Sequence, residues 1–232
     1  MPGPGGLAAK VVAVARVSYF LDPRLSEYLV AQIRPRDPLL DELVEETYQV
    51  APGHDLQISP DEGALLRVLV RLRAARRAIE LGTFTGYSSI CIARGLAPGG
   101  TLLCCDISAD WTAVARRYWE RAGLADRIEL RLGPQLDTLR ALPPAPSFDF
   151  AFMDAEKTEY IDCYEELVPR MTAGGLIAVD NTLRHGRIAD PTPPDERTVL
   201  MRSFNQHVAA DPRVESLIVP IADGLSLITV LG

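Results

Sequence analysis

The chain has 232 residues, of which 47% are hydrophobic, and a formal net charge of −7 at pH 7. This size and apolar content suit one well-packed α/β domain, and the acidic balance, with no basic run longer than a pair, argues against nucleic-acid binding. No apolar stretch reaches the ~18 residues that a membrane-spanning helix needs, so a membrane is not an expected partner either.

The start of the chain and its cysteines indicate a cytoplasmic protein. Residues 1–20 predict a flexible segment without a secretion signal, because Lys10 and Arg16 interrupt the apolar run. The cysteines show no CxxC or zinc spacing and lie in apolar segments, which predicts reduced, buried thiols at Cys91, Cys104, Cys105 and Cys163.

Helical patterns come first along the chain. Residues 21–50 have helical spacing that is broken near two prolines, which predicts two short helices, and residues 51–58 predict a loop. In "SPDEGALLRVLVRLRAA", Ser59 is the expected N-cap, with Pro60 in the first helical position and Glu62 three residues after the cap, as in a capping box. We expect a single domain over 21–232, with N-terminal helices in 21–58 and a Rossmann-like core in 59–232.

Strands then alternate with helices to the end of the chain. This alternation predicts right-handed βαβ units and a doubly wound, Rossmann-like sheet of about seven strands, with helices on both faces. A short "ADG" turn joins the last two strands, so the sheet is expected to be mostly parallel with an antiparallel last strand. The expected strands cover residues 77–83, 100–107, 127–133, 147–155, 174–181, 214–221 and 224–232.

The first two strands end in features that suit a nucleoside. Gly82 and Gly86 in "ELGTFTGYSS" allow a tight turn and close backbone approach, and Glu80 and Asp106 stand near strand ends. A carboxylate after the second strand can accept both hydroxyls of a ribose. In the alternative interpretation, the glycines only pack strand against helix and Asp106 caps the next helix.

The sequence lacks the usual motifs for phosphate binding. The fingerprint GxGxxG is missing, and the one GxGxxA match, "GPGGLA", follows no strand. There is also no GxxxxGK[ST] loop and no Tyr-x-x-x-Lys pair. The sheet edge therefore predicts a nucleoside site without a pyrophosphate cradle. S-adenosylmethionine, which carries adenine, ribose and a cationic sulfonium but no phosphate, fits this site and its acidic rim.

Two further strands also end in polar residues. Asp154 follows "DFAFM", and Asp180 and Asn181 follow "LIAV". Two carboxylates and an amide are hard oxygen donors of the kind that Mg²⁺ prefers. Each could also have a plain structural role, with Asp154 capping the next helix and the Asp-Asn pair forming a turn.

Lys157 stands out because the chain has 22 Arg and only two Lys. Arg stays protonated, whereas Lys can release its proton when it is buried or lies near another cation. A general base beside a metal that acidifies a phenol, whose ordinary pKa is ~10, is what methyl transfer to that phenol requires.

Five motifs occur in order: "IELGTFTGYSS", "CCDIS", "FDFAFMDAEK", "GGLIAVDNTL" and "DGLSLITV". With "LQISPDEGALLRVL" before the first strand, they resemble the cation-dependent O-methyltransferases of the caffeoyl-CoA and catechol type. The resemblance implies a homodimer that methylates one of two vicinal hydroxyls on a small aromatic acceptor. It also implies a divalent cation on Asp154, Asp180 and Asn181, Lys157 as base, and S-adenosylmethionine contacts from Ile58, Glu80, Gly82, Thr83, Ser88, Asp106, Gln135 and Glu156.

The chain departs from this family at the acceptor side and at one position on the adenine side. After "DNTL" it carries Arg184 and His185 in place of an aromatic and an amide residue, and Gln135 stands where the family often has Ala. A cationic Arg184 would favour an acceptor with a carboxylate, although both residues could equally be loop residues facing solvent. The alternatives are a metal-independent methyltransferase of the same fold, a non-catalytic dimeric module that binds S-adenosylmethionine, and an NAD-dependent reductase.

Overall fold

The computed structural model describes residues 19–52 and 56–232. Residues 1–18 of the expected flexible start lie outside this range. Eight helices are found in the described part of the chain: α1 Pro23–Ala31, α2 Pro38–Val50, α3 Pro60–Leu72, α4 Tyr87–Gly95, α5 Ala109–Arg121, α6 Gln135–Ala141, α7 Tyr160–Leu167 and α8 Glu196–Ala209. Within this part, none of these helices combines the length and apolar character that crossing a membrane requires.

Seven strands form one sheet in the order β3-β2-β1-β4-β5-β7-β6. β7 runs antiparallel between β5 and β6, and the other pairings are parallel, which confirms the expected doubly wound sheet with its antiparallel last strand. The strands are β1 Arg77–Leu81, β2 Thr101–Asp106, β3 Ile128–Leu132, β4 Phe148–Met153, β5 Met171–Val179, β6 Val214–Val219 and β7 Leu225–Val230.

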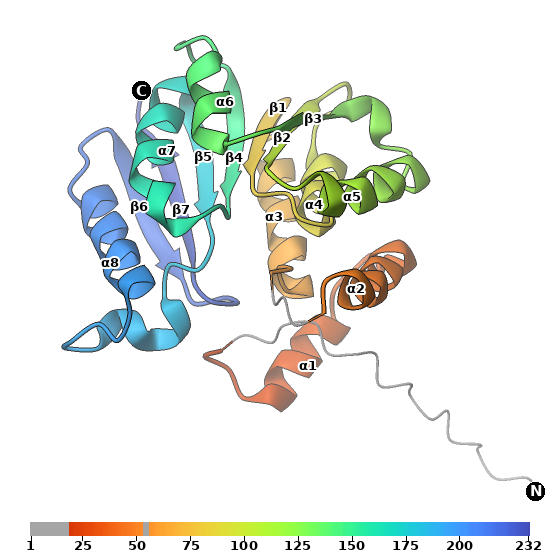
Figure 1. The fold of residues 1–232 in the computed structure, drawn as a ribbon, viewed down its shortest axis with the longest axis horizontal. Coiled ribbons are helices and arrows are strands. Elements are labelled where there is room, and N and C mark those ends of the chain that lie inside the picture. Colours follow the sequence, from red (N-terminus) through yellow and green to blue (C-terminus); the bar gives the residue numbers. More distant parts are fainter. Residues whose placement is uncertain (1–18, 53–55) are drawn as a thin grey trace, which may run out of the picture.

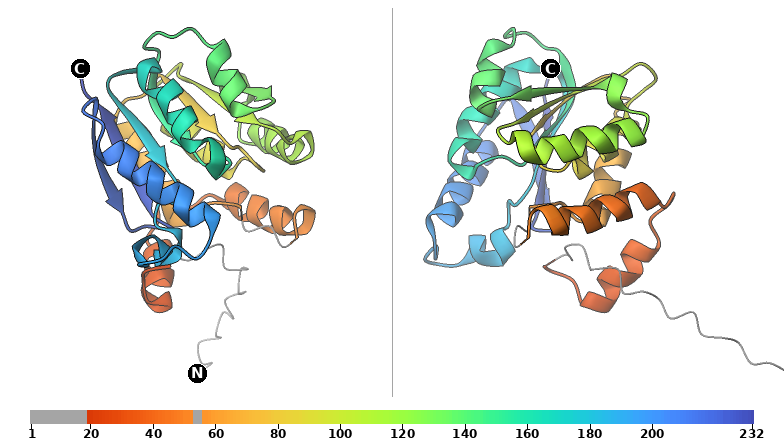
Figure 2. Two further views of the ribbon diagram at one scale, coloured as in Figure 1. Left: turned by 60° about the vertical axis from the view of Figure 1, so that its left-hand side comes forward. Right: turned by 45° about the vertical axis from the view of Figure 1, so that its right-hand side comes forward.

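Helices cover both faces of the sheet (Figures 1 and 2). Alternate residues of the central strands point to opposite faces, so Phe150 and Phe152 pack with α2 to α5, whereas Ala151 and Met153 pack with α6 to α8. This is why the central strands read as continuous apolar runs. The one polar residue inside β4, Asp149, accepts hydrogen bonds from the backbone N–H groups at the start of β1.

Helix starts follow the signals in the sequence. Ser59 accepts a hydrogen bond from the backbone N–H of Glu62 and so caps α3, and Ser108 caps α5 through the N–H of Trp111. The interpretation of Asp106 as the α5 cap is therefore wrong. Asp106 instead lies two residues before the cap and accepts from the N–H of Ser108.

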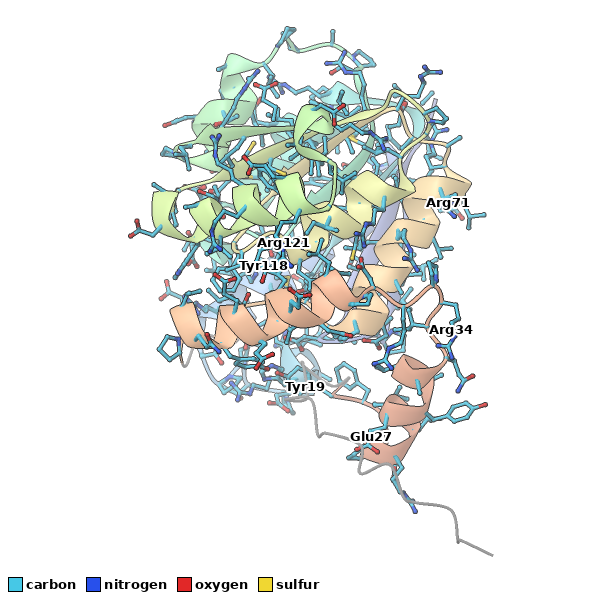
Figure 3. The ribbon with its side chains drawn as sticks, turned by 90° about the vertical axis from the view of Figure 1, so that its right-hand side faces the viewer. Tyr19, Glu27, Arg34, Arg71, Tyr118 and Arg121 are labelled. Carbon is cyan, nitrogen blue, oxygen red and sulfur yellow. The ribbon has the colours of Figure 1, made fainter. Side chains whose placement is uncertain are left out.

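The N-terminal helix α2 packs apolar side chains into the core and also makes charged contacts with α5. α2 lies beside α5, where Arg121 pairs with Glu42 at 2.5 Å and the hydroxyl of Tyr118 donates to Glu46 at 2.9 Å. Figure 3 shows Tyr118 and Arg121 between these two helices. α1 projects from the body of the protein (Figure 1), and Tyr19 before it returns to the core through a hydrogen bond to the carbonyl of Ala222.

The strand register brings four strand ends level. Leu81 of β1 pairs with Cys105 of β2 and Met153 of β4, and Met153 in turn pairs with Val179 of β5. The residues that follow these positions are Gly82, Asp106, Asp154 and Asp180, and they therefore share one edge of the sheet.

Candidate active site

A cavity of about 350 Å³ opens at this edge of the sheet. All the predicted site residues line it except Glu80 and Asp180, which are fully buried. The cavity lies at the carboxyl ends of β1, β2, β4 and β5, where ligands of doubly wound sheets bind. It also has walls that the sequence did not single out, including Phe84, Ile107, Trp111 and Arg197.

The turn after β1 needs glycine for two physical reasons. Gly82 has φ +90°, and a Cβ at this position would lie 2.2 Å from the carbonyl oxygen of Asp154. The backbone N–H of Gly82 donates to the carbonyl of Cys105, so the turn is tied to β2 as well. The turn therefore sits against the ends of both neighbouring strands.

The carboxylate of Asp106 holds the same turn. Its Oδ2 accepts from the backbone N–H groups of Thr83 and Phe84 at 2.9 and 2.8 Å, and its Oδ1 accepts from that of Ser108 at 2.7 Å. A carboxylate has about four acceptor positions, so a ribose would share this group with the backbone. Asp106 is 6% exposed and faces the cavity.

Glu80 lies behind this wall rather than on the rim where the sequence placed it. Its side chain points to the same face of the sheet as Ala78, and the Cys104 thiol donates to its Oε2 at 3.3 Å. Burial raises the pKa of Glu80 to about 7, against the opposing effect of nearby Ser88, Cys104 and Thr83 side chains. Among these groups, Ser88 and Thr83 line the cavity, so Glu80 lies directly behind its wall.

Apolar side chains form the wall beside Asp106. The rings of Phe84 and Trp111 meet edge to face with centroids 4.9 Å apart, and Ile107 next to Asp106 is 70% exposed. With Gln135 they form a surface suited to a flat heterocycle such as adenine. The signal in the sequence was an apolar residue that directly follows the acid at the end of β2.

The opposite end of the cavity is charged. Lys157 Nζ lies 3.0 Å from Asp154 Oδ1, 3.1 Å from the carbonyl of Ala155 and 2.7 Å from the hydroxyl of Tyr160. Burial and the neighbouring Asp154 and Asp180 carboxylates raise the pKa of Tyr160 well above its usual value, so this hydroxyl stays protonated. These contacts fix the position of Nζ at the cavity wall.

Asp154 does not cap the following helix. Glu156 caps a short 3-10 turn, Lys157–Glu159, by accepting from the backbone N–H of Lys157 at 3.0 Å, and α7 begins after Glu159 without a side-chain cap. Asp180 and Asn181 do form a turn, as one interpretation expected, since Asn181 has φ +63° and donates its side-chain amide to Asp180 Oδ2 at 3.0 Å. That turn also brings Asn181 to the cavity.

The donor chemistry at this end fits a divalent ion that prefers oxygen. Asp154, Asp180 and Asn181 offer two carboxylates and an amide from neighbouring strand ends. Within the described residues, no three His, Cys, Asp or Glu side chains cluster as a metal-ion site. The third protein ligand would therefore have to be the amide of Asn181. The ammonium of Lys157 lies beside Asp154 in the same part of the cavity.

The sheet order, the glycine turn and the acid after β2 are typical of Rossmann-like enzymes that bind a nucleoside. The chain matches the O-methyltransferase family over residues 31–231. The chain belongs to this family, and it is an S-adenosylmethionine-dependent O-methyltransferase. This excludes the NAD-dependent reductase considered above.

Individual relatives agree with this assignment. A probable caffeoyl-CoA O-methyltransferase 1 of Dictyostelium discoideum is 35% identical, covering 81% of this chain and 84% of that protein. The O-methyltransferase of Bacillus cereus in complex with SAH superposes with a TM-score of 0.81 at 33% identity, covering 89% of this chain and 97% of that one. The O-methyltransferase TomG of Streptomyces achromogenes in complex with SAM, involved in tomaymycin synthesis, has a TM-score of 0.81 at 30% identity, covering 90% and 96%.

Proposed function

We propose that this protein methylates one hydroxyl of a small aromatic acceptor with vicinal hydroxyls, using S-adenosylmethionine and Mg²⁺. The observation that carries the proposal is the pair Asp154 and Lys157 in the wall of a cavity that the Gly82 turn and Asp106 also line. Similar proteins that are named as caffeoyl-CoA O-methyltransferases support this class of acceptor.

In this proposal the cofactor occupies the end of the cavity near β1 and β2. The Asp106 carboxylate accepts from the ribose, and the apolar wall with Gln135 holds the adenine. The remaining predicted contacts place the methionine part near Asp154, where the sulfonium meets an acid-rich wall. They are Ile58, Gly82, Thr83, Ser88 and Glu156, with Glu80 behind them.

Methyl transfer is an in-line displacement. The acceptor oxygen forms a bond to the methyl carbon while the carbon–sulfur bond breaks, and the electron pair of that bond stays on sulfur as a neutral thioether. The ammonium of Lys157 must first give up a proton, and its Nζ then accepts the proton of the acceptor hydroxyl. Asp154, Ala155 and Tyr160 hold Nζ in position for this transfer.

Asp154 and Asn181, which line the cavity, and the buried Asp180 are the residues that would hold the divalent cation. When bound, such a cation lowers the pKa of a phenolic hydroxyl from its ordinary value of ~10. The same residues also order the site without it, because Asp154 pairs with Lys157 and Asp180 pairs with Asn181.

The test is a panel of catechols assayed with S-adenosylmethionine, with Mg²⁺ and with EDTA. We expect methylation of at least one catechol that EDTA abolishes and added Mg²⁺ restores. Turnover unaffected by EDTA would favour the metal-independent alternative, in which Asp180 and Asn181 only form a turn. Failure to methylate any catechol under any metal condition would exclude the proposed acceptor class.

We also propose a homodimer in a reducing, cytoplasmic setting. The buried, unpaired state of Cys91, Cys104, Cys105 and Cys163 supports the second part, because oxidising compartments favour disulfides. The homodimer rests on the family resemblance, and sedimentation of the purified protein tests it.

A further inference from the structure

Among the residues that the structure describes, three cationic side chains line the cavity, and two of them are closely paired. Lys157 lies 3.0 Å from Asp154 Oδ1, and the guanidinium of Arg197 lies 3.5 Å from Glu156 Oε2. These pairs neutralise much of the charge at this wall. The third cation, Arg184, has a different environment.

Arg184 retains donors that the protein does not use. Its contact with a carboxylate is a 4.0 Å approach to Asp195 Oδ1. That oxygen already accepts from the N–H and hydroxyl of Thr198 as the cap of α8, and the other oxygen of Asp195 lies 3.3 Å from Arg187. The Nε of Arg184 is buried and has no hydrogen-bond partner among the described residues, and the side chain is only 17% exposed. A guanidinium with unused donors, buried in a cavity wall, indicates a ligand with acceptor oxygens.

The backbone around Arg184 is strained and firmly held. Arg184, His185 and Gly186 have φ of +48°, +56° and +83°, and non-glycine residues reach this region at a cost. Asp223, which is fully buried, holds the turn by accepting from the N–H of His185 through its side chain and from the N–H of Leu183 through its carbonyl. The fold therefore maintains a costly turn that places Arg184 at the cavity.

We propose that Arg184 binds a carboxylate on the aromatic acceptor. This inference rests on the proposed function and specifies its acceptor class as a catechol-type aromatic acid. The planar fork of a guanidinium matches the two oxygens of a carboxylate, which makes such contacts both strong and directional. Lys157 and Asp154 lie on the wall of the same cavity, so the acceptor's hydroxyls and its carboxylate are held by separate groups.

The test compares 3,4-dihydroxybenzoate with its methyl ester, which has the same ring without the charge. Arg184→Met is assayed beside Arg187→Met, a control on the same loop whose side chain is 50% exposed and outside the cavity lining. We expect Arg184→Met to lower kcat/KM for the acid by about 10- to 100-fold and for the ester by less than about 3-fold. Arg187→Met should leave both values near wild type.

A binding measurement separates this inference from the proposed function. Calorimetry should show that the S-adenosylhomocysteine complex of Arg184→Met binds 3,4-dihydroxybenzoate with an affinity lowered by a similar factor. Arg184→Lys should recover part of this affinity. Equal losses for acid and ester would overturn the inference and leave Arg184 a structural residue. A comparable loss on caffeoyl-CoA, whose anionic groups are phosphates, would also overturn the carboxylate assignment. If wild-type protein methylates no catechol of the panel yet binds the acid through Arg184, the proposed function fails and the carboxylate site stands.

Discussion

Replacing Gly82 with alanine should disrupt the cavity, because the turn after β1 leaves no room for a side chain. The added Cβ would lie 2.2 Å from the carbonyl oxygen of Asp154. An ordinary C···O contact is about 3.3 Å or longer, so the ends of β1 and β4 would have to separate by about 1 Å. The residue also has φ +90°, where alanine is strained.

The expected magnitude combines these two effects. A left-handed alanine costs about 1–2 kcal/mol, and overpacking of this kind costs about 1–3 kcal/mol, so the free energy of unfolding should fall by about 2–5 kcal/mol. For a chain of this size that corresponds to a Tm lower by about 4–20 °C. A displacement of about 1 Å at a reacting site can also lower the rate about 100-fold.

The assay is thermal unfolding together with calorimetric titration of S-adenosylhomocysteine. Gly99→Ala is the matched control, because Gly99 has φ +72° but no atom within 4 Å of an added Cβ. Its free energy of unfolding should fall only by the cost of a left-handed alanine, about 1–2 kcal/mol, and it should bind S-adenosylhomocysteine as wild type does. If Gly82→Ala has the same Tm as Gly99→Ala and binds S-adenosylhomocysteine with wild-type affinity, the close approach to Asp154 does not determine the shape of the cavity.

Two further substitutions test the charged and buried groups. Lys157→Met should lower kcat by about 10²- to 10⁴-fold while S-adenosylhomocysteine affinity stays near wild type, and a comparable loss of affinity would argue against a role as base. Glu80 has a pKa raised from 4.5 to about 7 in the folded state, so its contribution to stability is present below pH 4.5 and is lost as the pH rises toward 7. Glu80→Gln should remove this pH dependence. As the pH rises from 5 to 8 without cofactor, the free energy of unfolding of Glu80→Gln should increase by about 3 kcal/mol relative to that of wild type. Parallel pH–stability curves for the two proteins would show that burial does not shift this carboxyl.

Local sequence patterns were sufficient for the arrangement of strands and helices. "SFDFAFMDA" is apolar on both faces because β4 lies between β1 and β5 with helices on each side. Parallel strands end at the same edge, so the order of strands and helices along the chain is enough to bring Gly82, Asp106 and Asp154 together. The antiparallel last strand followed from the short turn, but its position between β5 and β6 depends on long-range pairing that no local pattern contains.

Side-chain placement was predicted less well. Glu80 was expected on the rim, yet the period of two along β1 turns it, with Ala78, into the face of the sheet that α2 to α5 cover. Phe84 and Trp111 come from separate segments and meet only because α5 packs beside the turn after β1. Such contacts join residues distant in the chain, which spacing alone does not reveal.

The residues at the charged end of the cavity show most clearly what the sequence determines and what the tertiary structure determines. The sequence alone determined that Asp154 and Lys157 follow a buried central strand, since apolar runs and strand ends are local properties. Only the tertiary structure decided that Arg184 faces the cavity with unused donors, because that depends on the buried carboxylate of Asp223 holding a left-handed turn. Local composition cannot specify a conformation that distant, buried contacts maintain against its own strain.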